Sequence, residues 1–268
     1  MVLLYCDETN LVAKPGAFFV YGGLSVPSET ALDLSTKVDA IRKKFHVPDE
    51  FKLKFNPGPA GLNNQQFIEL KQNVISAAVE SNCELYVSII LHDIAKDVNE
   101  ARRNEINRIC FHFNCSLKRN NDVGLVLIDR FEDQKIDGHL REKFSLGLRN
   151  MPYCDSMRLD KIVGFHYSAI GQSNFPSIID IIIGSFRLCI NEHTANPNEI
   201  SERQKAILGL ISPLFPRETT ALIPETHLFF SPKIIKVGIY RDQYTSLSQF
   251  FTSVGICPDQ SISAERTY

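Results

Sequence analysis

Three carboxylates, Asp7, Asp129 and Asp180, stand at positions that an ordinary solvated surface does not explain. Asp7 and Glu8 close the apolar segment VLLYCDE, Asp129 closes VGLVLID, and Asp180 interrupts the apolar stretch PSIIDIIIGSF. A buried carboxylate costs free energy unless a donor or a cation accompanies it. Oxygen ligands that converge from separate elements are what Mg²⁺ or Mn²⁺ requires. The sequence therefore points to a candidate metal site.

Such a site would suit phosphodiester chemistry. Two ions about 3.5 to 4 Å apart can activate a water and stabilise the leaving oxygen. We expect Asp7, Asp129 and Asp180 to be direct ligands. Neighbouring strand residues point to opposite faces, so Asp7 and Glu8 cannot both face one metal ion unless the strand bends. We therefore expect Glu8 to be a fourth ligand or to lie just outside the ligand shell. The competing explanation for each acid is a turn cap at a strand end or a helix ion pair.

The elements that position these acids follow from hydrophobic spacing and turn signals. Residues 2–8 and 17–27, joined through Lys-Pro-Gly, predict a β-hairpin. Strands are further predicted at 51–55, 83–92, 123–131 and 162–170, and helices at 29–45, 63–81, 93–118, 138–150 and 174–193. The natural packing is an α/β fold with a mixed sheet between helices. Ligands gather at strand ends in such sheets, which is where Asp7, Glu8 and Asp129 fall.

The chain length allows one large domain or two smaller ones. We predict one catalytic domain at 1–195 and a C-terminal extension at 196–268 that packs on it. In the extension, residues 201–211 are expected to form a helix, and 227–232 and 233–240 are strand-like. No internal repeat occurs.

The charge balance limits how the chain meets its partners. It carries 29 Lys and Arg against 31 Asp and Glu, a formal net charge of -2. Any binding of nucleic acid must therefore be local rather than driven by a global field. Apolar runs fall well short of the roughly 20 residues that span a bilayer, and the first residues do not form a signal peptide. We expect a cytoplasmic protein without membrane contact.

Other residues able to do chemistry have a plainer explanation. The seven cysteines form no CxxC pair and are expected to be reduced, buried thiols. Cys110, His112 and Cys115 do not share one helix face, which disfavours a zinc site. His92 and His166 lie near strand ends, where a structural role is the usual one. Basic helix positions are expected to face solvent, among them Arg42 to Lys44, Arg102, Arg103, Arg108, Lys118 and Arg119.

Five segments together resemble a known family. They are LLYCDETN, FFVYGGLSVP, FKLKF, LVLIDRF and SNFPSIIDIIIGSF, in this order. Their order and spacing are similar to the domain-of-unknown-function family 3800, over about residues 1 to 190. That family's pattern is a strand ending in Asp-Glu-Ser-Gly, a Gly-Gly strand, a Glu-x-Lys element, a strand ending in Asp, and a helix with Gln-x-Ala-Asp.

The resemblance implies a ribonuclease-H-like fold, a metal-dependent nuclease activity with Mg²⁺ or Mn²⁺, and nucleic acid as the partner. It also implies a bacterial setting linked to mobile elements or defence, with a homodimer or a defence-system protein as a further partner. The family's acids match Asp7, Glu8, Asp129 and Asp180, and its lysine matches Lys54. Lys54 would bind a phosphate or orient water; a solvated lysine is the alternative.

The chain departs from the family pattern beside two of the acids. Thr9-Asn10 replaces Ser-Gly, and Ser177-Ile178-Ile179 replaces Gln-x-Ala. A catalytically silent binding or regulatory module therefore stays open as the alternative function. A phosphatase with an aspartyl nucleophile is disfavoured because Thr9 stands where a second acid is wanted. No glycine-rich nucleotide loop and no GxSxG motif occurs.

Overall fold

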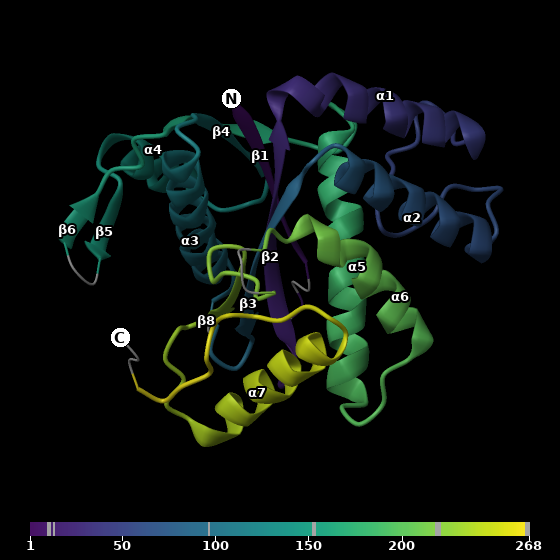
Figure 1. The fold of residues 1–268 in the computed structure, drawn as a ribbon. Coiled ribbons are helices and arrows are strands. Elements are labelled where there is room, and N and C mark those ends of the chain that lie inside the picture. Colours follow the sequence, from purple (N-terminus) through teal and green to yellow (C-terminus); the bar gives the residue numbers. More distant parts are fainter. Residues whose placement is uncertain (10–11, 13, 96, 152–153, 218–220, 266–268) are drawn as a thin grey trace.

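A six-stranded mixed sheet with helices on both faces forms the centre of the molecule (Figure 1). The structure is a computed structural model, and it describes residues 1–9, 12, 14–95, 97–151, 154–217 and 221–265. The strand order is β7-β4-β1-β2-β3-β8. This confirms the predicted α/β class, and the sheet is consistent with a ribonuclease-H-like fold.

The order and direction of the strands determine where Asp7 and Asp129 lie. β2 (Phe18–Pro27) runs antiparallel to both of its neighbours, β1 (Val2–Thr9) and β3 (Glu84–Leu91). β4 (Gly124–Asp129) pairs in parallel with β1, and β7 (Ile162–Ser168) in parallel with β4. β8 (Leu228–Ser231) adds a parallel strand beside β3. Because β1 and β4 are parallel, their carboxyl ends meet at one edge of the sheet.

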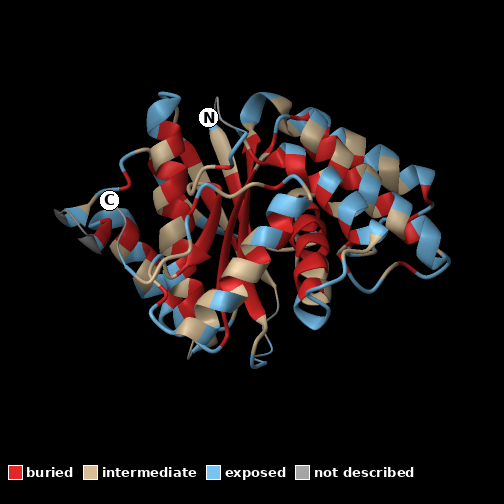
Figure 2. Cartoon of the chain, turned by 60° about the horizontal axis from the view of Figure 1, so that its bottom comes forward, coloured by how far each residue is buried: buried red, intermediate tan, exposed pale blue. Residues whose placement is uncertain are grey.

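The helices divide between the two faces of the sheet. One face carries α3 (Val98–Arg119) and α4 (Ile136–Ser145). The other carries α1 (Ser28–Lys44), α2 (Asn64–Glu80), α5 (Phe175–Ala195), α6 (Glu202–Ile211) and α7 (Gly238–Ser253). Figure 2 shows the buried strands and helix faces turned inward on both sides. In the described part of the chain no helix is both long enough and apolar enough to span a membrane.

Three predicted segments differ from the structure. Residues 51–55 do not form a strand, because the Phe55 N–H donates to Asp180 and the Phe51 carbonyl accepts from Arg42. The predicted helix 138–150 ends at Ser145, where Gly147 turns the chain with φ 84° into the hairpin of β5 (Leu148–Met151) and β6 (Cys154–Met157). Residues 233–240 form no strand; α7 begins within them.

The C-terminal segment belongs to the same hydrophobic core as the strands. Leu208, Phe230 and Phe251 lie in one buried cluster with α5 and β2. The six described cysteines are free: Cys6, Cys83, Cys110, Cys115, Cys189 and Cys257. Cys154 has a side chain outside the described residues, and Asn10 lies outside them altogether. The division at residue 195 stays a prediction.

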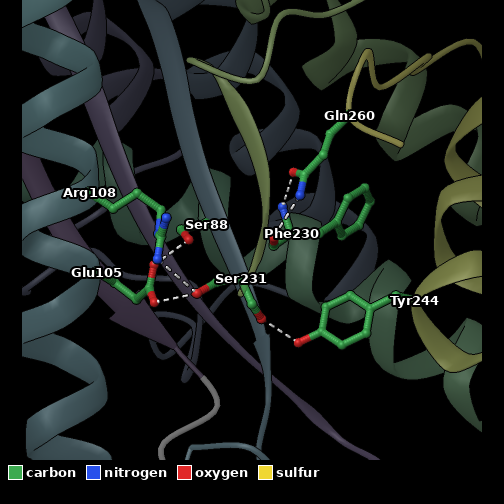
Figure 3. Close-up of polar contacts among 7 residues, drawn as sticks. All are labelled: Ser88, Glu105, Arg108, Phe230, Ser231, Tyr244 and Gln260. Carbon is green, nitrogen blue, oxygen red and sulfur yellow. Dashed lines mark hydrogen bonds and ion pairs between the residues drawn. The ribbon is translucent and has the colours of Figure 1, made fainter. Parts of the chain in front are cut away.

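A buried polar network attaches β8 to the rest of the sheet (Figure 3). Ser231 donates to Glu105 at 2.8 Å, and Glu105 also accepts from Ser88 and from Arg108. The Tyr244 hydroxyl accepts from the Leu91 N–H at 2.7 Å and donates to the Ser231 carbonyl at 2.5 Å. On the outer side, the Gln260 amide both accepts from and donates to the Phe230 backbone. The exposed edge of β8 is thereby covered, as edge strands require.

The close approach of α5 to the sheet depends on a missing side chain. A Cβ at Gly22 would stand 2.4 Å from Cγ2 of Ile183, a residue of α5. Gly22 pairs with Asp7 across the β1–β2 ladder. The glycine therefore lets α5 lie directly over the strand that carries the first acid.

We predict that Gly22→Ala destabilises the fold by about 1 to 3 kcal/mol, because the added methyl overpacks the interface with Ile183. Gly138→Ala is the control, since nothing lies within 4 Å of its added Cβ in α4; it should stabilise by about 0.5 to 1 kcal/mol. Urea unfolding of both variants measures the difference. Equal stability of Gly22→Ala and wild type would contradict the close packing.

Tyr244→Phe tests the attachment of β8. Removing the hydroxyl leaves two buried backbone groups without their partner, so we expect a loss of about 1 to 3 kcal/mol in the free energy of unfolding. Tyr240→Phe, on a half-buried side chain of the same helix, is the matched control and should change little. An equal effect of the two substitutions would mean that the hydroxyl bonds do not stabilise the strand.

Candidate active site

Asp7 and Asp129 lie side by side on the face of the sheet that α5 covers. Cys6 pairs with Ile128, so the two aspartates follow in the same register. Tyr5 and Leu127, two residues before each aspartate, pack into the cluster that contains α5. Strand alternation therefore directs both carboxylates to that face. Asp7 is 8% exposed, and Asp129 is half-buried.

Asp180 reaches the same region from α5. This helix begins at Phe175, whose ring stacks on Tyr5 at 4.9 Å, and it packs along β1 and β2. Asp180 lies in the second turn and accepts a hydrogen bond from the Phe55 N–H at 2.5 Å. The structure thus brings Asp180 of α5 close to Asp7 and Asp129 at the strand ends.

Burial raises the pKa values of the three aspartates, and electrostatic repulsion among them raises those of Asp7 and Asp129 further. Burial raises the pKa of Asp7 well above its ordinary value, and the charges of Glu8, Asp180 and Asp129 raise it further. Burial and Asp180 likewise raise the pKa of Asp129, despite a backbone hydrogen bond from Arg130. Burial also raises the pKa of Asp180, opposed by the Phe55 N–H, Lys54 and Arg187. A proton or a cation is needed to relieve this repulsion.

Glu8 points to the other face of the sheet. Its carboxylate pairs with Arg102 of α3 at 2.6 Å, and the two side chains are only 6% and 10% exposed. The Arg102 guanidinium also lies over the Phe131 ring at 4.5 Å. Burial raises the pKa of Glu8 to about 7, although Arg102 lowers it. The structure therefore places Glu8 apart from the three aspartates, within range of their charge.

Lys54 is the predicted lysine, and it lies near Asp180. It is half-buried, and its charge lowers the pKa of Asp180. The segment that carries it is a loop held by the bond between Phe55 and Asp180. The structure thus brings Lys54 to the acids without the strand that the sequence suggested.

The donor chemistry of the site suits a hard cation, but the side chains are not closed around one. Within the described ranges, no three His, Cys, Asp or Glu side chains are grouped so that they could hold a metal ion. The Asp180 carboxylate is engaged with the Phe55 N–H instead. Carboxylate oxygens are the ligands that Mg²⁺ and Mn²⁺ prefer.

Several basic residues expected in solvent are paired with acids. On α3, Arg102 pairs with Glu8, Arg103 with Asp133 and Arg108 with Glu105. Sequence reasoning missed the first two pairs because their acids come from distant segments, whereas Glu105 lies three residues before Arg108 on α3 itself. Lys118 pairs with Asp160 at 2.9 Å.

The other histidine candidates pack against aromatic side chains or lie at the surface. His112 is buried against Phe229, and burial lowers its pKa to about 3. His92 packs edge-on against Phe19 at 6.2 Å, and Asp93 accepts from the Gly16 N–H. His166 is exposed. Ser168 is buried and pairs with Asp129 in the β4–β7 ladder, next to the acids.

Comparison with known proteins gives a limited likeness. No family model matches this chain. Over 93 residues the chain is 30% identical to the DNA polymerase catalytic subunit of Psittacid herpesvirus 1 (isolate Amazon parrot/-/97-0001/1997). The match covers 35% of this chain and 9% of that protein. The chain thus spans less than a tenth of its relative's length.

The buried charge of Asp7 predicts a pH-dependent gain from Asp7→Asn. A raised pKa in the folded state means that stability falls as pH rises from the unfolded value through the folded one. Without metal, we expect the variant to melt higher than wild type at pH 8 but not near pH 4, by about 2 to 4 °C per kcal/mol relieved. Mg²⁺ or Mn²⁺ should raise the melting temperature of wild type more than that of the variant.

Asp242→Asn, at an exposed position of α7, is the control for this measurement and should show no such pH dependence. Calorimetric melting in metal-free buffer over the pH range gives the comparison. A variant that melts below wild type at pH 8 would show that the Asp7 charge is already compensated.

Proposed function

We propose that the chain is a metal-dependent phosphodiesterase that cleaves nucleic acid, with Asp7, Asp129 and Asp180 as ligands for Mg²⁺ or Mn²⁺. The observation that carries the proposal is the group of three mutually repelling aspartates, Asp7 and Asp129 at the carboxyl ends of the parallel strands β1 and β4 and Asp180 on α5. Perturbed carboxylates at such an edge are typical of functional sites. The partial likeness to a viral DNA polymerase catalytic subunit supports a nucleic-acid substrate.

The roles follow from the positions of the side chains. Asp7 and Asp129 stand on neighbouring strands, which lie about 4.8 Å apart, so their carboxylates can share one ion. Asp180 supplies the third carboxylate from α5. When bound, the metal polarises the phosphodiester and activates water. Lys54 supplies positive charge to a non-bridging phosphate oxygen.

Glu8 has a supporting role in this proposal. Its ion pair with Arg102 holds it on the α3 face, so it acts on the aspartates through its charge rather than as a ligand. The family 3800 assignment, the bacterial defence setting and a partner protein or second copy of the chain belong to the same proposal. They rest on the sequence resemblance alone.

The alternative function is a catalytically silent binding or regulatory module. Two observations favour it: no described trio of side chains is grouped for a metal, and Thr9 and Ser177 to Ile179 depart from the family pattern. In that case the acids would stay protonated or hydrogen-bonded, as Asp180 is with Phe55. Metal binding separates the two functions.

The test is cleavage of labelled single-stranded, duplex and RNA–DNA hybrid oligonucleotides with Mg²⁺, Mn²⁺ or chelator. We expect metal-dependent cleavage by wild type and a loss of at least about 100-fold in Asp7→Asn and Asp129→Asn, because each removes charge that binds the ion. Asp242→Asn should cleave as wild type does. The preferred oligonucleotide identifies the substrate class.

Two results would overturn the proposal. Cleavage that survives in both variants would place the chemistry elsewhere. If no oligonucleotide is cleaved and calorimetry detects no binding of Mg²⁺ or Mn²⁺ to wild type, the silent module is the better description.

A further inference from the structure

A cluster of positive charges lies beside the three aspartates, on the side of α2. The Lys71 ammonium of α2 stands 4.3 Å from the ring centre of Phe55, and 4.4 Å from that of Phe67. The Arg187 guanidinium of α5 lies 5.5 Å from the same Phe55 ring. Two cations from different helices therefore gather around one aromatic side chain.

Neither cation forms an ion pair with a described residue, although the charge of Arg187 acts on Asp180 and lowers its pKa. In the described part of the chain, no carboxylate lies within 4 Å of the charged nitrogens of Lys71 or Arg187. The Nε of Arg187 is buried, and no acceptor reaches it there. Arg203 of α6 adds a third positive charge near Lys71, although Arg203 itself pairs with Glu192. The charged groups of Lys71 and Arg187 are thus without an ion-pair partner among the described residues.

This charge is held partly out of water. Both side chains are half-buried, and burial together with Arg203 lowers the pKa of Lys71. Removing a cation from water without a partner is unfavourable, and the aromatic contacts offset only part of that cost. An anion bound between the two side chains would supply the missing partner.

The cluster is joined to the aspartates through Phe55. The N–H of Phe55 donates to Asp180, while its ring carries the two cations. A Cβ at Gly184 would stand 2.4 Å from Phe55, so the ring is pressed against α5 one turn beyond Asp180. The positive charges are therefore fixed next to the acids, on the other side of a single ring.

A hollow lies beside the cluster. Its volume is about 590 Å³, and it is lined by the loop residues Asn56 to Pro59, by Leu62 and Asn63, and by Asn64 and Phe67 of α2. Phe67 is the ring that also contacts Lys71. A strand bound at the cluster has room to pass along this side of the protein.

We propose that Lys71 and Arg187 bind a backbone phosphate of the nucleic-acid strand, next to the phosphodiester that lies at the aspartates. This subsite rests on the proposed function for its substrate class. Phosphate oxygens accept charge-assisted hydrogen bonds from the terminal guanidinium N–H groups of Arg187 and from the Lys71 ammonium. The subsite orients the strand without taking part in bond cleavage.

The first test uses inorganic phosphate as the probe. We expect phosphate titration to shift the NMR signal of the Arg187 Nε–H and to raise the melting temperature of wild type. Lys71→Gln with Arg187→Gln should abolish the phosphate-dependent stabilisation while remaining folded, because the substitutions break no ion pair with a described residue. An unmoved Arg187 signal in the presence of phosphate would overturn the subsite.

The second test uses a labelled oligonucleotide and fluorescence anisotropy in chelator, where metal-dependent cleavage is absent. The double variant should bind at least about tenfold more weakly, and the salt slope of log K should fall by about 1 to 2. Lys71→Arg should retain binding. The control is Lys118→Gln with Arg141→Gln, the same charge change on α3 and α4, which should bind as wild type does.

The outcomes separate this subsite from the proposed function. A phosphate response that depends on Lys71 and Arg187, without cleavage of any oligonucleotide, keeps the subsite and removes the nuclease. Metal-dependent cleavage by wild type, with binding equal in the two double variants, keeps the nuclease and removes the subsite.

Discussion

The packing of α5 against β1 and β2 is the constraint on which the site depends. Gly22 leaves room for Ile183, and the helix consequently lies close enough to bring Asp180 to the ends of β1 and β4. The same contact excludes water from Asp7. Burial and like charge then act together, so the fold itself creates the repulsion among the carboxylates. A looser helix would leave three ordinary surface acids.

Buried carboxylates are compensated differently on the two faces of β1. On the α3 face, Glu8 has a full partner in Arg102, which is itself held against Phe131. On the α5 face, Asp7 has a backbone N–H as its hydrogen-bond donor and two further aspartates as neighbours. Adjacent residues of one strand thus lie in opposite electrostatic settings. The face with uncompensated charge is the one on which the proposed metal would be bound.

Much of this arrangement was predictable from the sequence, and the failures have physical causes. Strong β-branched runs and helical spacing located β1 to β4 and α5, and parallel strand ends brought Asp7 to Asp129. The strand predicted at 51–55 is wrong, because an alternating sequence pattern does not by itself provide a neighbouring strand with which to pair. Arg102 and Lys71 were missed because a charged helix residue has the same sequence signal whether it faces solvent or a distant partner. The spacing of Phe67 and Lys71, four residues apart on α2, was the available hint.

In the proposed function, a single nucleic-acid strand would meet both the acids and the cations. A phosphodiester brings negative charge, which the aspartates alone would repel, so positive charge beside them favours the approach of a strand. The charges of Lys54 and Arg187 reach Asp180, and the Phe55 ring contacts both Lys71 and Arg187. Because the Phe55 N–H donates to Asp180 while its ring meets these two cations, one residue connects the acids to the positive charges. In the proposed function, the acids would hold the metal while the cations hold a phosphate of the same strand.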